Sequence, residues 1–156
     1  MAVKAGPNVI AALNDILCAE LTAINQYFLH AKLFGNWGYG KLASKVRSES
    51  IDEMKHADEL IERILYLDGI PNVQKLGRIR IGENPTEVFE SDLALEQDAI
   101  PRLNAAIALC VAEGDNGTRE LLAEILVSEE EHLDWIETQL RLIRELGAPA
   151  YLAEQL

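Results

Sequence analysis

Hydrophobic residues recur every three or four positions through four long stretches of the chain, which is the spacing of amphipathic helices. Segments rich in glycine or proline separate these stretches, at residues 35–40, 68–71 and 114–117. Asn84, Pro85 and Glu87 have the residue types preferred at the N-cap, N1 and N3 positions of a helix. The pattern predicts helices over roughly residues 8–35, 41–67, 85–112 and 118–146, with a short fifth helix over 149–155.

Short links join the first helix to the second and the third to the fourth, whereas a polar connection of about 16 residues joins the two pairs. A four-helix bundle with one long crossover and a short C-terminal fifth helix is the ferritin-like, all-α arrangement. We expect residues 1–156 to form a single domain of this kind. Pro101 should remove a backbone hydrogen bond from the third helix and bend it locally.

Composition and charge narrow the functional class. Hydrophobic residues make up 49% of the 156 residues and aromatic residues only 6%, which is typical of a helical protein. The formal net charge of −12 argues against nucleic acid as a partner, and an acidic surface or cavity would instead concentrate cations.

Cysteine usage and hydropathy predict a cytoplasmic location with no membrane partner. Cys18 and Cys110 have no ligand partners at useful spacing, so we interpret them as packing thiols in a reducing compartment. Residues 1–16 contain no apolar segment of secretory length, and no other segment is expected to span a membrane.

Each predicted helix carries a glutamate inside its apolar face, near the middle: Glu20, Glu53, Glu96 and Glu129. Buried carboxylates without partners are strongly disfavoured, and four together repel one another. Two divalent metal ions would balance their charge of −4. His56 and His132 each follow a glutamate by three residues, so both members of a Glu-x-x-His pair share one helix face and can bind one metal site.

An internal repeat supports this ligand set. Glu20 and Glu53 are 33 residues apart, as are Glu96 and Glu129, and the offset between the two helix pairs is 76 residues. Two similar helix pairs would each supply half of a dinuclear centre with approximate twofold symmetry. Oxygen-rich sites with one imidazole per ion suit iron, manganese or zinc.

At these residues the sequence resembles the bacterioferritins, from about Asn8 to Leu156. The resemblance is carried by the stretches AELTAINQYFLHAKLFGNWG, SESIDEMKHADELIERIL, IGENPTEVFESDLALE and SEEEHLDWIETQL. It implies a cytoplasmic homo-oligomeric cage of 24 subunits built from dimers. Each subunit would oxidise Fe²⁺ with O₂ or H₂O₂ at a centre of two iron ions, and ferric mineral would be stored inside.

The resemblance also assigns roles to individual residues. The ferroxidase ligands fall on Glu20, Glu53, His56, Glu96, Glu129 and His132. Glu53 and Glu129 would bridge the two irons, and Tyr27 matches a tyrosine beside the centre that could hydrogen-bond or donate an electron. Met54 matches the axial ligand of a haem b shared between two subunits, and it is the only methionine besides Met1. A small ferredoxin acting through the haem would deliver electrons for iron release.

Several alternatives stay open. Many bacterioferritins have a histidine that belongs to an iron site on the cavity wall, and this chain has Ser48 at that position, although Glu49 and Asp52 remain. The family's route for electrons from the cavity to the dinuclear centre is therefore not assumed here. His30 belongs to no evident ligand set and is interpreted as a structural, hydrogen-bonded histidine. A rubrerythrin-like peroxidase would need a second set of cysteines. A shell subunit that stores haem or iron with little ferroxidase activity is the remaining alternative.

Overall fold

The computed structural model describes residues 6–156 and is helical throughout, apart from its connections. The helices are α1 (Pro7–Asn36), α2 (Gly40–Tyr66), α3 (Pro85–Glu113), α4 (Asn116–Leu146) and α5 (Ala148–Ala153). These bounds differ from the predicted ones by at most two residues. The expectation about an N-terminal secretory segment falls partly on residues 1–5, which lie outside the described residues.

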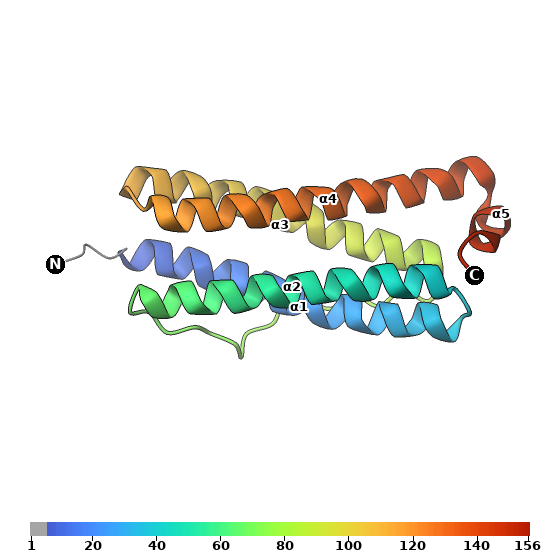
Figure 1. The fold of residues 1–156 in the computed structure, drawn as a ribbon, viewed down its shortest axis with the longest axis horizontal. Coiled ribbons are helices and arrows are strands. Elements are labelled where there is room, and N and C mark those ends of the chain that lie inside the picture. Colours follow the sequence, from blue (N-terminus) through green and yellow to red (C-terminus); the bar gives the residue numbers. More distant parts are fainter. Residues whose placement is uncertain (1–5) are drawn as a thin grey trace.

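The four long helices form a bundle in which α1 packs against α2 and α3, and α4 packs against the same two helices (Figure 1). The helices therefore follow the ring order α1, α2, α4, α3, and each runs antiparallel to its neighbours in the ring. The long crossover between α2 and α3 runs along α1, and α5 packs across the end of α4. The predicted ferritin-like bundle with one crossover and a short fifth helix is confirmed.

Local sequence explains where the helices begin and end. The side chain of Asn84 accepts a hydrogen bond from the Glu87 backbone N–H at 3.0 Å, as the N-cap prediction requires. Gly114 ends α3 in the left-handed region at φ 72°, where a residue with a Cβ would be strained. Pro101 lies inside α3, and the helix continues through it to Glu113.

The core consists of two apolar clusters at opposite ends of the bundle, separated by a band of polar residues. On α1, Val9 to Leu17 belong to the first cluster and Ala23 to Phe34 to the second, with buried Glu20 between them. The other three long helices show the same order of apolar, acidic and apolar segments. The band of buried acids is consequently held at mid-height by packed side chains above and below it.

The hydropathy of α1 has a structural explanation. Among the described residues, α1 is the one helix long and apolar enough to cross a membrane by length and composition. Its apolar character has a different cause in this bundle, because its buried face packs against α2 and α3 and contains Glu20, Gln26 and His30.

Candidate metal centre

The structure brings all six predicted ligands together in the middle of the bundle. One oxygen or nitrogen atom from each of Glu20, Glu53, His56 and Glu129 forms a group within 4.8 Å. A second group, with the same maximum separation, consists of Glu53, Glu96, Glu129 and His132. Each long helix contributes a glutamate, and the two histidines come from α2 and α4.

The two groups share Glu53 and Glu129, which are therefore placed to contact both halves of a dinuclear centre. The Nδ1 atom of His56 lies 3.2 Å from Glu129 Oε1 and 3.5 Å from Glu20 Oε2. On the other side, His132 Nδ1 lies 3.0 Å from Glu53 Oε1 and 3.8 Å from Glu96 Oε1. Glu20 and Glu96 each belong to one group only, so the arrangement has the approximate twofold symmetry that the sequence repeat predicts.

Buried polar atoms that form no hydrogen bond, and whose close contacts are charged contacts within the cluster, show that this cluster fits metal ions. The orphaned atoms are Glu20 Oε2, Glu53 Oε1, His56 Nδ1, Glu96 Oε2, Glu129 Oε1 and His132 Nδ1. All four glutamates are at most 2% exposed. Such atoms are costly to bury unless a ligand satisfies them, and six of them converge on one point. Two cations would satisfy the whole set.

Burial and mutual repulsion govern protonation in the metal-free cluster. Burial, followed by repulsion from neighbouring carboxylates, raises the pKa of Glu20 well above its ordinary value. Burial also opposes ionisation of Glu129, but contacts with Glu96 and the two imidazoles outweigh it and lower that pKa. For His56, burial is outweighed by contacts with Glu129 and Glu53, which raise its pKa to about 9. The metal-free cluster therefore holds protons that incoming cations must displace.

Tyr27 lies beside the cluster, where the resemblance places it. It is fully buried, and its hydroxyl donates a hydrogen bond to Glu96 Oε1. Burial, followed by repulsion from Glu96, raises the pKa of Tyr27 well above its ordinary value, so the hydroxyl keeps its proton. The other oxygen of Glu96 is among the orphaned atoms and remains available to a metal ion.

A buried network behind Tyr27 was missed by the sequence analysis. Asp92 on α3 accepts hydrogen bonds from Gln26 Nε2 at 2.9 Å and from His30 Nδ1 at 2.8 Å. His30 is fully buried and hydrogen-bonded through both ring nitrogens, in agreement with its interpretation as a structural histidine. Asp92 precedes Glu96 by four residues and so shares its helix face, a signal that could have identified it.

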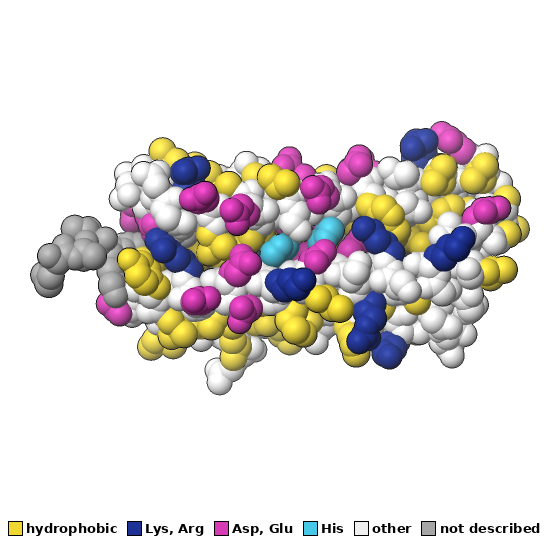
Figure 2. Space-filling model, viewed as in Figure 1, with side chains coloured by type: hydrophobic (Ala, Val, Ile, Leu, Met, Phe, Trp, Pro, Cys, Tyr) yellow, Lys and Arg dark blue, Asp and Glu magenta, His cyan; other side chains and the backbone are white. Residues whose placement is uncertain are grey.

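Two further acids on α2 flank the centre. Glu49 is buried with one oxygen orphaned, and burial raises its pKa to about 8. Asp52 Oδ2 lies 3.4 Å from His132 Nε2, the ring nitrogen that faces away from the cluster. Ser48, in contrast, is exposed and donates its hydroxyl proton to the Lys45 carbonyl. Histidine side chains reach the surface midway along the face of the molecule formed by α2 and α4, among acidic side chains (Figure 2).

Met54 and the cysteines lie outside the cluster. Met54 is 57% exposed on α2, so it faces away from the core as its position one residue after Glu53 predicts. Cys110 is buried in the first apolar cluster, Cys18 is partly buried, and both are free thiols.

Comparison with known proteins agrees with this fold and site. Residues 10–146 match the ferritin family, described as a ferritin-like domain. The chain is 50% identical to bacterioferritin BfrA of Mycobacterium tuberculosis over 148 residues, covering 95% of this chain and 93% of the relative. It is also 50% identical to the bacterioferritin of Streptomyces coelicolor, covering 94% and 88%, and 47% identical to that of Brucella melitensis, covering 95% and 92%.

A bundle of this topology with a carboxylate and histidine cluster at its centre defines a ferritin-like protein. Within that class, the chain belongs to the bacterioferritin family. Family membership supports iron storage as its function and iron as its metal.

Proposed function

We propose that this protein is a ferroxidase that oxidises Fe²⁺ with O₂ or H₂O₂ and stores the product as ferric mineral inside a cage of 24 subunits. The observation that carries this proposal is the set of six orphaned, buried ligand atoms from four helices. A passive bundle would not keep such a set without compensation. The same residues supply the negative charge that stabilises Fe³⁺ relative to Fe²⁺.

The position of each side chain in the cluster would determine its role as a ligand. Glu53 and Glu129, which belong to both ligand groups, would contact both ions, whereas Glu20 and Glu96 would each complete one site. His56 and His132 would bind through Nδ1 after losing the protons they share with the glutamates. Tyr27 would hold Glu96 in place through its hydrogen bond, and its phenol would also donate an electron.

Met54 would supply the axial sulfur of a haem b shared with the corresponding methionine of a second subunit. Its side chain fits this role because it is exposed on α2, one helical turn from exposed Ile51, which offers an apolar surface to a porphyrin. The haem would supply one-electron chemistry when bound. A small ferredoxin would be the electron donor for iron release, and the cage would function in the cytoplasm.

The deciding experiment is stopped-flow measurement of ferric absorbance after adding Fe²⁺ in air to iron-free protein. We expect a fast phase in the parent that saturates at about two irons per chain, as a two-ion cluster requires. The Glu53→Ala, His132→Ala variant should lack this phase, because it removes one shared and one terminal ligand.

A matched control removes two exposed acids from the same helices, Glu59→Ala and Glu131→Ala, and should keep the fast phase. Oxidation by the parent no faster than in buffer would refute ferroxidase activity. The chain would then be a shell subunit that stores iron or haem without oxidising iron.

A further inference from the structure

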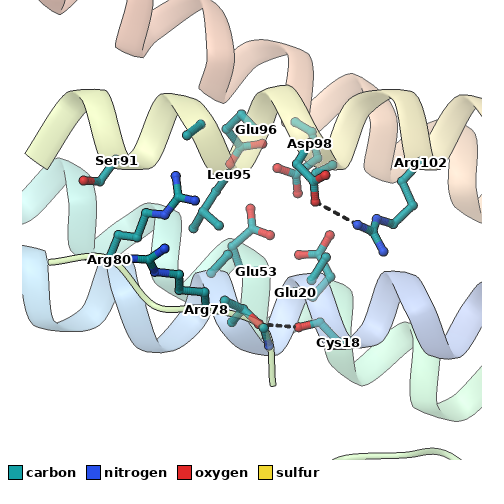
Figure 3. A pocket seen from close by; sticks show the side chains of 17 residues that line it. Cys18, Glu20, Glu53, Arg78, Arg80, Ser91, Leu95, Glu96, Asp98 and Arg102 are labelled. Carbon is teal, nitrogen blue, oxygen red and sulfur yellow. Dashed lines mark hydrogen bonds and ion pairs between the residues drawn. The ribbon is translucent and has the colours of Figure 1, made fainter. Parts of the chain in front are cut away.

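A cavity of about 280 Å³ reaches the metal cluster between α1 and α3, beside the crossover (Figure 3). All four cluster glutamates line it. Three other lining residues are Arg78 and Arg80 on the crossover and Arg102 on α3. In Figure 3 the two crossover arginines lie on one side of the cluster glutamates and Arg102 lies on the other. We call these three residues the arginine rim.

Two members of the arginine rim form no direct ion pair, although the cluster glutamates line the same cavity. Arg102 donates a hydrogen bond to Asp98 at 2.8 Å, so one of the three charges is paired. Neither Arg78 nor Arg80 forms an ion pair within the described part of the chain, and both are exposed. A channel that served only cations would not place two free guanidinium groups beside its carboxylates.

Hydrogen bonds to α1 hold the crossover backbone around Arg78 and Arg80 in place. Gly77 N–H donates to Thr22 Oγ1 at 2.8 Å, and Arg80 N–H donates to Gln26 Oε1 at 2.9 Å. These bonds lie on both sides of Arg78. Thr22 and Gln26 are one helical turn apart on α1, and Gln26 is itself held by Asp92. The crossover therefore presents both guanidinium groups from a defined position on the bundle.

We propose that the arginine rim binds a small tetrahedral oxyanion, inorganic phosphate, at the mouth of this cavity. Guanidinium groups match phosphate geometry because each presents paired N–H donors to two oxygens. The guanidinium N–H groups of Arg78 and Arg80 are exposed and available to donate to such a ligand. The screening length at physiological salt is about 8 Å, so acids far from the cavity mouth, which make up most of the net charge of −12, have little effect there. Phosphate binding at this site is a property separate from iron oxidation and does not require it.

Binding is measured on the iron-free, assembled protein by isothermal titration with inorganic phosphate, checked by broadening of the ³¹P resonance. We expect a saturable site on each chain of the parent. The Arg78→Ala, Arg80→Ala variant should bind phosphate at least about tenfold more weakly, since charge-assisted hydrogen bonds are lost. Both side chains are exposed, so the fold should be unaffected.

The control variant Arg47→Ala, Arg144→Ala removes the same charge from exposed positions that do not line the cavity, and should retain parent affinity. Equal binding by the parent and the Arg78→Ala, Arg80→Ala variant would overturn the proposal. The parent is also titrated with adenosine monophosphate. If this phosphate ester binds as tightly as inorganic phosphate, free phosphate is not the specific ligand. Because no iron is present, these results are independent of whether the protein is a ferroxidase.

Discussion

The Nδ1 atom of His30 lies 2.8 Å from Oδ1 of Asp92, and both side chains are buried. His30 Nε2 accepts a hydrogen bond from the Gly82 backbone N–H at 3.0 Å, which places the ring proton on Nδ1, toward Asp92. The pair therefore joins three segments, α1, α3 and the crossover, directly behind the metal cluster. Gly82 must be a glycine here, since a Cβ would lie 2.4 Å from the Val88 backbone nitrogen.

Asp92→Ala should lower the free energy of unfolding by about 3 kcal/mol, because it leaves the buried donors of His30 and Gln26 without an acceptor. Urea unfolding of the iron-free protein measures this change. Asp98→Ala is the matched control on α3: its side chain is 65% exposed, and the loss should stay within about 0.5 kcal/mol. Equal losses in the two variants would show that the network does not stabilise the fold.

Tyr27→Phe should weaken binding of Co²⁺, a redox-inert probe here, by roughly threefold to tenfold. The reason is that Glu96 loses the hydroxyl that holds one of its oxygens, a hydrogen bond that contributes about 1 kcal/mol. Titration of the visible Co²⁺ absorbance measures the affinity. Tyr39→Phe, at a partly buried position remote from the ligand groups, should bind Co²⁺ as the parent does. Unchanged affinity in Tyr27→Phe would leave electron donation as the role of Tyr27.

The sequence predicts the helices and the six clustered residues well because both depend on local periodicity. A helix repeats every 3.6 residues, so a glutamate in the apolar stripe must point into the core. Glu20 and Glu96 follow this rule, and the structure buries both. Glu20 and Glu96 are 76 residues apart, and so are His56 and His132. This repeat could be assigned to two helix pairs because glycine and proline mark where the helices end.

The crossover contacts could not be predicted in the same way. Residues 67–84 have no regular secondary structure, so no periodicity indicates which side chains face α1. Arg78 and Arg80 read as ordinary exposed charges in the sequence, and only the fold brings them to the metal cluster. The apolar character of α1 is ambiguous for a related reason: hydropathy does not distinguish a core helix from a membrane span.

Metal affinity should rise with pH. The pKa of His56 is raised to about 9 in the metal-free protein, so at neutral pH the imidazole carries a proton that a metal ion must displace. Each proton released makes the apparent affinity about tenfold higher per pH unit, up to that pKa. Co²⁺ titrations at several pH values below about 8, with proton release followed in weakly buffered solution, measure the slope. An affinity independent of pH would show that His56 is already neutral when the metal arrives.

Met54→Leu should abolish haem binding without slowing iron oxidation. Leucine keeps the apolar surface but removes the sulfur, and residues 2–156 contain no other methionine that could replace it. Met54 is 57% exposed and belongs to neither ligand group, so the metal cluster should be undisturbed. Absorbance of the haem Soret band after reconstitution, measured beside the fast ferric phase, tests both expectations.

Ile51→Ala is the control, because it removes a neighbouring apolar side chain and leaves the ligand. A full Soret band in Met54→Leu would exclude Met54 as the axial ligand, whereas a lost band with a normal ferric phase would separate the haem site from the iron site.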